Sequence, residues 1–277
     1  MTVPARRPPV CLTIAGSDSG GGAGIQADLK AFAACGTHGT SAIAALTAQN
    51  TVAVTGVHAV PGAFIVEQVR AVVDDLGVDA VKLGMLGSVA TIDAVAQALD
   101  LVADGVPIVV DPVMVAESGS RLLDVEAQDA LVAQILPRAT VVTPNVPEAR
   151  VLAGDAELDG EALARAVHRL GPQAVVVTGG HRDEATDVLF DGRSTYEIPG
   201  PRHPDGSAHG SGCTHSSALA AHLAHGWPLL AAAQAARAVA ADAVRHGLRG
   251  LGRGAGPVDV LAVTDRAPQH PVGDPKA

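Results

Sequence analysis

Six short apolar segments recur along the chain, each separated from the next by a stretch of helical character. They are rich in β-branched residues and lie at 10–16, 40–49, 78–84, 106–111, 139–144 and 173–180. Uninterrupted apolar strands that alternate with helices are typical of a parallel sheet covered on both faces. The sequence therefore predicts an α/β fold with a mostly parallel central sheet and helices on both faces.

The rest of the chain fits one domain built on this sheet. Segment 185–199 is predicted to form a β-hairpin around Asp191-Gly192 at the sheet edge, and two Ala-rich helices are predicted near 213–225 and 229–247. No internal repeat or linker is visible, and 277 residues suit a single core. We expect one domain over 1–277, with disordered tails at about 1–8 and 266–277.

Composition excludes several classes of partner. The formal net charge is −10 and Lys and Arg do not cluster, which argues against nucleic acid. No run of about 18 uncharged apolar residues predicts a membrane span. The three cysteines are widely spaced, which favours a reducing, cytoplasmic location, and Cys11 and Cys35 are expected to be structural. A small molecule held in a local site is the expected ligand.

A glycine-rich loop, GSDSGGGAGIQADLK (16–30), follows the first predicted strand and leads into a helix. Its Gly22-x-Gly24-x-x-Ala27 spacing fits a dinucleotide fingerprint, but no acidic residue follows between Asp28 and Glu67 to bind a ribose. A nicotinamide oxidoreductase is therefore disfavoured, and the Gly-Lys-Ser/Thr of a Walker loop is also missing. The loop is either a tight turn or a backbone cradle for a small substrate.

Asp28 is expected in the first turn of the helix after this loop. Its carboxylate there either complements the helix dipole or accepts hydrogen bonds from a substrate hydroxyl or amine. The sequence leaves both roles open.

The segment HGSGCTHSSALAAHLAHG (209–226) begins with small residues and continues as a predicted helix from about Cys213. Backbone N–H groups at a helix N-terminus bind anions, and phosphoryl transfer needs donors directed at its developing charge. The helix dipole is expected to lower the pKa of the Cys213 thiol, so that a thiolate can accept a substrate proton. The alternative is a buried cysteine that acts as a small apolar side chain.

The histidines give a weaker signal. Eleven are scattered along the chain and no HExxH metal motif occurs. His209 lies beside the anion loop and is a candidate phosphate contact. His215, His222 and His225 are expected on the surface or in helix packing, and none is assigned to a metal.

The segment TPNVPEA (143–149) places Asn145 and Glu148 three residues apart at the exit of a predicted strand. On the first turn of a helix the two side chains share a face, which suits a hydrated Mg²⁺ beside phosphates. A capping box is the alternative. Asp111, at the end of a neighbouring predicted strand, adds a second carboxylate that could reach the metal through water.

Seven segments together resemble, in order and spacing, the hydroxymethylpyrimidine/phosphomethylpyrimidine kinases of thiamine biosynthesis. Over about residues 10–260 they read LTIAGSDSGGGAGIQADLK, ALTAQNT, VKLGML, DPVM, TPNVPEA, GGH and HGSGCT. The resemblance implies a ribokinase-like fold, ATP and Mg²⁺ as cofactors, and a homodimer. It also implies two successive phosphorylations, of 4-amino-5-hydroxymethyl-2-methylpyrimidine and then of its monophosphate.

The resemblance also implies roles for single residues. The pyrimidine pocket falls on Gly16, Asp28, Gln49, Met85 and Val113. The anion hole and proton acceptor fall on Gly210, Ser211, Gly212 and Cys213, where sugar kinases of the superfamily carry an aspartate base. ATP and its phosphates fall on Asn145, Thr178, Gly180 and His209, and Mg²⁺, through water, on Asp111 and Glu148.

One departure from the family pattern concerns phosphate binding. Many members carry Lys-Gly-Gly-His where this chain has Thr178-Gly179-Gly180-His181. A threonine donates a hydrogen bond but brings no charge. Arg182 is close in sequence, and we expect it to be a candidate for the missing cation.

Two other functions fit the same residues. Some pyridoxal kinases carry this cysteine-bearing loop and also phosphorylate a hydroxymethyl arm on a heteroaromatic ring, although Gln49 and Met85 favour the pyrimidine. A catalytically silent ligand-binding protein of the same fold is the alternative from another class, and Thr178 gives it some support. A sugar kinase is disfavoured because Cys213 replaces its aspartate.

Overall fold

The computed structural model describes residues 7–115, 119, 122–179, 185–203 and 206–266. A nine-stranded sheet in the order β3-β2-β1-β4-β5-β6-β7-β8-β9 runs through them. The strands are β1 (Val10–Asp18), β2 (His38–Gln49), β3 (Val54–Ala59), β4 (Ala80–Leu83), β5 (Ile108–Val110), β6 (Val141–Val142), β7 (Val175–Val177), β8 (Asp187–Phe190) and β9 (Thr195–Ile198).

The predicted parallel sheet is confirmed for its centre. From β2 to β7 all neighbouring strands pair in parallel, and each of the six predicted apolar segments overlaps one of these strands. The β8–β9 hairpin also forms at the sheet edge as predicted. The sequence analysis missed β3, an exposed strand that pairs antiparallel with β2. Its exposed positions carry no apolar run, so the signal used for the other strands was absent.

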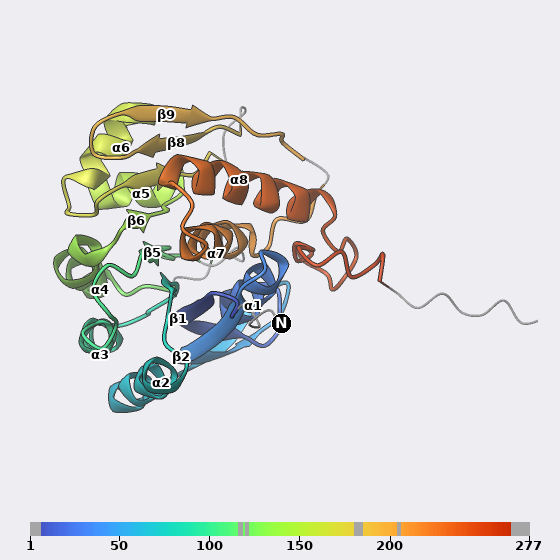
Figure 1. The fold of residues 1–277 in the computed structure, drawn as a ribbon. Helices are drawn as coiled ribbons and strands as arrows, with labels where there is room; N and C mark the ends of the chain where they lie inside the picture. The colour runs from blue at the N-terminus through green and yellow to red at the C-terminus, as the bar shows by residue number, and fades with distance from the viewer. Residues whose placement is uncertain (1–6, 116–118, 120–121, 180–184, 204–205, 267–277) are drawn as a thin grey trace, which may run out of the picture.

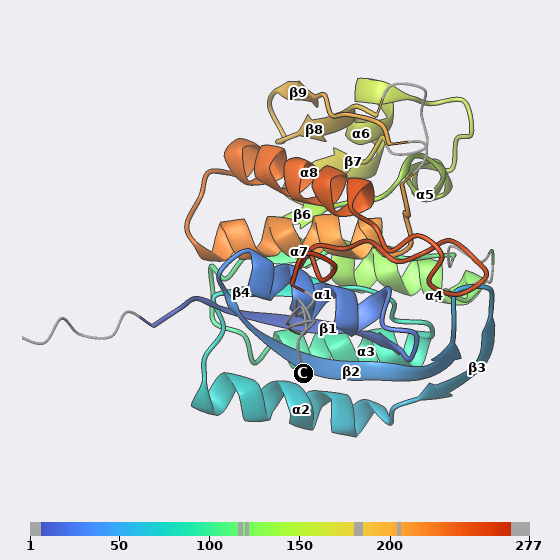
Figure 2. The same ribbon diagram turned by 90° about the vertical axis from the view of Figure 1, so that its right-hand side faces the viewer.

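Helices cover both faces of the sheet, as Figures 1 and 2 show. They are α1 (Gly24–Ala34), α2 (Gly62–Asp75), α3 (Val89–Leu99), α4 (Val125–Ala130), α5 (Val146–Ala153), α6 (Gly160–His168), α7 (Ser211–Ala224) and α8 (Leu229–Arg245). A π-helical turn (Leu131–Ile135) and a 3-10 turn (Leu136–Arg138) continue α4. Among the described residues, none of the helices is both long and apolar enough to cross a membrane.

Two apolar cores lie on opposite faces of the sheet. Leu12 and Ile14 of β1 face the core shared with α2, α3, α5 and α6, whereas Cys11 faces the core shared with α1, α7 and α8. This division follows from the alternation of side chains along a strand. It also puts Thr13 and Lys82 on the α1–α7 face, where they are fully buried. Two polar side chains in an apolar core require partners.

Candidate active site

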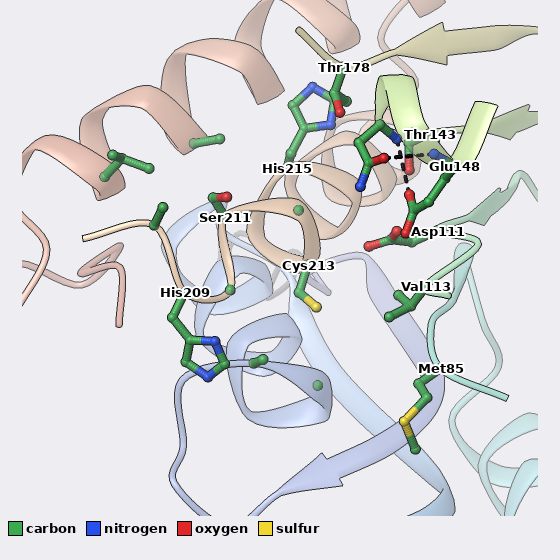
Figure 3. Close-up of a pocket in the computed structure, with 18 of the residues that line it drawn as sticks. Met85, Asp111, Val113, Thr143, Glu148, Thr178, His209, Ser211, Cys213 and His215 are labelled. Carbon is green, nitrogen blue, oxygen red and sulfur yellow. Dashed lines mark hydrogen bonds between the residues drawn. The ribbon is translucent and has the colours of Figure 1, made fainter. Parts of the chain in front are cut away.

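A cavity of about 410 Å³ opens where the parallel strands end, which is the usual ligand position in such sheets (Figure 3). It brings together residues predicted from seven separate segments of the sequence. The predicted site residues that line it are Gly16, Gln49, Met85, Asp111, Val113, Asn145, Glu148, Thr178, His209, Gly210, Ser211, Gly212 and Cys213. Asp28 does not line it, and Gly180 lies outside the described residues.

The glycine-rich loop is held by the carboxylate of Asp18 at the end of β1. Its oxygens accept the N–H groups of Gly20 (2.8 Å), Gly22 (3.0 Å) and Ala23 (2.9 Å). Nε2 of His209 lies 3.1 Å from the same carboxylate. Burial alone would raise the pKa of Asp18, but the hydrogen bonds from His209 and the backbone hold it below its usual value. These hydrogen bonds anchor the loop as one wall of the cavity.

His209 is engaged with this loop. Its ring is buried and fills the space beside Gly22, where a Cβ would collide with it. Figure 3 shows His209 at the other side of the cavity from Thr178, although both line it. A contact between His209 and phosphate remains a prediction, and the geometry gives the ring a second role in fixing the Asp18 loop.

One wall of the cavity is apolar and adaptable. Met85 rests on Gly16, because a Cβ on Gly16 would come within 2.5 Å of the methionine Cε. Val113 continues this wall, and Gln49 adds a carboxamide whose oxygen accepts from the hydroxyl of Thr47 (3.2 Å). An unbranched thioether adjusts to flat rings, and a carboxamide offers both a donor and an acceptor. This wall suits a heteroaromatic ring with polar substituents.

Asp28 lies below the cavity. It falls in the second turn of α1 rather than the first, so the predicted dipole role is wrong. Its Oδ1 accepts from Nζ of Lys82 (2.8 Å) and Oγ of Ser217 (2.8 Å), and its Oδ2 accepts from Oγ1 of Thr13 (2.6 Å). The carboxylate is fully buried, and these three donors come from β4, α7 and β1. Asp28 therefore ties these elements together beneath the site.

Lys82 reaches the cavity from β4 and was not singled out from the sequence. Burial by itself would lower the pKa of its amine, but the contact with Asp28 outweighs burial and the pKa lies above its usual value. Lys82 is therefore a permanent positive charge at the cavity floor. A lysine inside the apolar segment VDAVKLG was the signal that could have found it, since buried charges are almost always paired.

Cys213 lies in the first turn of α7 and points into the cavity (Figure 3). The expectation of a lowered thiol pKa is wrong: burial raises the pKa of Cys213 to about 12, and Asp28 and Asp111 add to the rise. Lys82 and the N–H of Gly24, which donates to the sulfur, lower the pKa, but by less than burial and the two carboxylates raise it. The helix N-terminus cannot offset the loss of solvent and two nearby carboxylates.

Asn145 and Glu148 combine the two roles considered for them. Oδ1 of Asn145 accepts the N–H of Glu148 (2.9 Å) and Oε2 of Glu148 accepts the N–H of Asn145 (3.1 Å), which makes a capping box for α5. Both side chains also line the cavity. The capping interaction therefore fixes the carboxylate at the cavity wall instead of excluding it from the site.

Glu148 and Asp111 are two buried carboxyl groups whose negative charges act on each other. Burial and the charge of Asp111 raise the pKa of Glu148 to about 8. Burial also raises the pKa of Asp111, although Lys82 and the hydroxyl of Ser216, which donates to Asp111 (3.1 Å), work against the rise. A hard cation with oxygen ligands would relieve this repulsion. In the described ranges no three His, Cys, Asp or Glu side chains could hold a metal ion alone.

Thr178 lines the cavity just beyond β7. Its N–H donates to the carbonyl of Pro144 (2.9 Å), which holds it beside Asn145. Arg182, the cation suggested by the sequence, lies outside the described residues, as do Gly180 and His181.

His215 is a cavity residue that the sequence analysis placed elsewhere. It was expected on the surface or in helix packing, but it is only 4% exposed and lines the cavity with Asp187 and Arg237. Its position two residues after Cys213 on α7 gave no distinct signal among scattered histidines. The α8 residues Ala240 and Val244 complete this end of the cavity.

Known sequences match this chain over most of its length. The model of the family described as phosphomethylpyrimidine kinase matches residues 18–259. A hydroxymethylpyrimidine/phosphomethylpyrimidine kinase of Mycobacterium bovis is 45% identical over 267 residues, which cover 93% of this chain and 96% of that protein. The thiamine biosynthesis bifunctional protein ThiED of Geobacter sulfurreducens is 47% identical over 260 residues, 92% of this chain, but the match spans only 53% of that longer protein.

Solved structures of two kinds of vitamin kinase have similar folds. The ADP complex of Bacillus subtilis pyridoxal kinase superposes with a TM-score of 0.83 at 36% identity, covering 93% of this chain and 99% of that one. A phosphomethylpyrimidine kinase from Clostridium difficile superposes with a TM-score of 0.73 at 39% identity, covering 83% of this chain and 96% of that one.

Proposed function

Because the chain belongs to the phosphomethylpyrimidine kinase family, we propose that it phosphorylates the hydroxymethyl group of 4-amino-5-hydroxymethyl-2-methylpyrimidine with ATP, and then phosphorylates the monophosphate. The family resemblance and the ribokinase-like α/β fold predicted from the sequence are confirmed. The chain is accordingly a phosphotransferase.

The observation that carries this proposal is the convergence of three kinds of group on one cavity. The Gly16–Met85 wall and Gln49 suit an aminopyrimidine ring, and Cys213 stands at the N-terminus of α7. Asp111 and Glu148 provide carboxylates beside that terminus. A ring against the wall directs its hydroxymethyl arm toward Cys213, where backbone N–H groups can stabilise the transferred phosphoryl group.

In the transfer, the hydroxyl oxygen forms a bond to the terminal phosphorus of ATP while the bond from that phosphorus to the bridging oxygen of ADP breaks. The hydroxyl proton leaves toward Cys213, whose sulfur can take it only as a thiolate. Lys82 favours the thiolate, whereas burial and the charges of Asp28 and Asp111 oppose it. The charges around the cavity floor therefore control whether Cys213 is a thiol or a thiolate that can accept the proton.

Asp111 and Glu148 are the residues that would hold Mg²⁺, directly or through water, because their carboxyls face the cavity and repel each other. Bound there, Mg²⁺ would neutralise the carboxylates and phosphates and so weaken the negative field around the thiol. The other two carboxylates of the described cavity wall, Asp18 and Asp187, accept backbone N–H groups, so the remaining ligands would be phosphate oxygens and water.

Product analysis tests the proposal directly. The purified protein is incubated with ATP, Mg²⁺ and the pyrimidine, with pyridoxal in a parallel tube, and the products are identified by mass spectrometry. We expect the mono- and diphosphorylated pyrimidine. A protein that consumed no ATP with either ring but still bound the pyrimidine would be a silent ligand-binding protein.

Pyridoxal kinase activity is the second candidate, since the Bacillus subtilis pyridoxal kinase superposes with a higher TM-score than the Clostridium difficile phosphomethylpyrimidine kinase. Both ring substrates carry a hydroxymethyl arm, and the apolar wall does not distinguish them by shape. Phosphate transfer to pyridoxal alone would select this candidate. Homodimer formation and a cytoplasmic location stay predictions, the first of which sedimentation of the purified chain can test.

A further inference from the structure

Three cavity residues hold half of the unpaired buried polar atoms in the described part of the chain. Eight buried side-chain nitrogen and oxygen atoms there have no hydrogen-bond partner. Four of them are Oδ2 of Asp187, Nδ1 and Nε2 of His215, and Nε of Arg237. Buried polar atoms in folded proteins nearly always have a partner, so four such atoms on one cavity wall point to a ligand-binding site.

These residues, called here the Asp187 cluster, come from β8, α7 and α8. Oδ1 of Asp187 accepts the N–H of Gly179 (2.9 Å), which fixes the carboxylate next to Thr178. Its Oδ2 lies 3.3 Å from Nε2 of His215, and its Oδ1 lies 3.7 Å from Nε of Arg237. Asp187 is only 1% exposed. It therefore holds an imidazole and a guanidinium together at the cavity wall. Nη2 of Arg237 donates to the carbonyl of Ala185, whereas Nε of Arg237 and Nδ1 of His215 make no hydrogen bond to the described residues.

The position of the cluster relates it to phosphate binding. Gly179 follows Thr178, which pairs with Asn145 of the capping box. His215 lies two residues beyond Cys213 on α7, and Figure 3 shows its ring at the same end of the cavity as Thr178. The cluster therefore stands between the N-terminus of α7 and the position where this chain carries a threonine in place of a lysine.

The chemistry of the cluster selects an anion. A bound cation would face the guanidinium of Arg237, which is always charged. A phosphate oxygen can accept from both Arg237 and His215, and such charge-assisted hydrogen bonds are the stronger ones. Asp187 keeps the local charge balanced when the ligand is absent.

We propose that His215 and Arg237 form the subsite for the phosphate chain of a nucleoside di- or triphosphate, with Asp187 holding both donors in position. This inference rests on the proposed function, because it assigns residues to nucleotide binding within the same cavity. The hydrogen-bond donors that a lysine at position 178 would bring from the end of β7 come in this chain from His215 on α7 and Arg237 on α8.

Calorimetric titration with ADP and with adenosine, in the absence of any ring substrate, tests the inference. His215→Leu keeps the bulk of the side chain and removes both nitrogens. We expect it to weaken ADP binding about 10- to 100-fold, the value of one or two hydrogen bonds to a charged group, and to leave adenosine binding unchanged. Arg237→Met should show the same selective loss, so the test does not depend on one variant folding.

A matched control lies on the same helix. His222 also has two unpaired buried ring nitrogens, but it stacks on Trp227 and does not line the cavity. His222→Leu should bind ADP and adenosine as the unaltered chain does. Adding Thr178→Lys to His215→Leu should recover at least about tenfold of the ADP affinity, because the amine restores a donor at this end of the cavity.

The inference is overturned if His215→Leu and Arg237→Met bind ADP as tightly as the unaltered chain, or lose ADP and adenosine equally. If the unaltered chain binds ADP but phosphorylates neither ring, the proposed substrates fail and the subsite stands. An unaltered chain that bound no ADP would overturn nucleotide use itself, and the subsite with it.

Discussion

Nζ of Lys82 and Oδ1 of Asp28 lie 2.8 Å apart, and neither side chain has any exposed surface. Their ion pair joins β4 to α1 directly below the cavity, and the amine also acts on Cys213 and Asp111. A buried charge that loses its partner is costly, whereas a buried pair replaced by apolar side chains can cost little. The pair therefore couples the stability of the fold to the electrostatics of the site.

Lys82→Met should lower the free energy of unfolding by about 3–5 kcal/mol, because it leaves the carboxylate of Asp28 buried without its cation. Urea denaturation followed by circular dichroism measures the change. The double variant Lys82→Met/Asp28→Leu should lose clearly less than the two single variants added together. Additive losses would mean that the two residues contribute independently of their contact.

Cys213 should react slowly with iodoacetamide near pH 7.5, since a thiol with a pKa of about 12 is almost entirely protonated there. Cys11, with a pKa raised to about 12, and Cys35, with a pKa raised to about 11, should also be slow. Peptide mapping after timed alkylation gives the rate at each site. Rapid modification confined to Cys213 would show that its thiolate is already present in the free protein.

Cys213→Ala should reduce the rate of phosphoryl transfer about 10²- to 10⁴-fold if the sulfur accepts the hydroxyl proton, and should leave binding of the pyrimidine largely intact. Steady-state kinetics and equilibrium binding separate the two effects. Cys35→Ala, outside the cavity, is the matched control. A loss of less than tenfold would reduce Cys213 to a positioning residue.

Glu148→Gln should make the stability of the metal-free protein depend less on pH. The folded pKa of about 8 exceeds the ordinary value of 4.5, so the folded state holds an extra proton between these values. Stability from this group is present at low pH and is lost as the pH rises toward and through 8. In EDTA, the free energy of unfolding should fall less between pH 5 and pH 8.5 in the variant than in the unaltered chain. The glutamine can still form the capping box.

The same substitution addresses metal binding. Glu148→Gln should raise the Mg²⁺ concentration needed for half-maximal activity, because one of two carboxylates is removed. An unchanged metal requirement would leave Glu148 with the capping role alone. The pH experiment and the Mg²⁺ titration thus test different properties of one side chain.

The sequence predicted the elements whose signals are local. Apolar segments located β1, β2, β4, β5, β6 and β7, and the polar residues after them located most of the cavity. Parallel strands end at the same edge of the sheet, so residues that are distant in sequence could be brought together by topology alone. The loops around Gly16 and Gly210 were found in this way.

Properties that depend on tertiary neighbours were not predictable in the same way. The pKa of Cys213 depends on burial and on the charges of Asp28 and Asp111, none of which the local helix terminus indicates. The depth of Asp28 depends on its donors from three other elements. His215 became a cavity residue only because β8 and α8 bring Asp187 and Arg237 against α7.

Met85 and Gly16 form a ring-binding wall that is separate from the residues of phosphoryl transfer, so the two parts of the cavity can change independently in sequence. The ring is bordered by a flexible thioether on a residue without a Cβ, while the transfer chemistry depends on the first turns of α7 and the buried Asp28. A single added methyl at Gly16 would displace Met85 and reshape the ring wall without altering α7. Substitutions in the ring wall can therefore change which heteroaromatic alcohol is phosphorylated, while the residues of phosphoryl transfer stay the same.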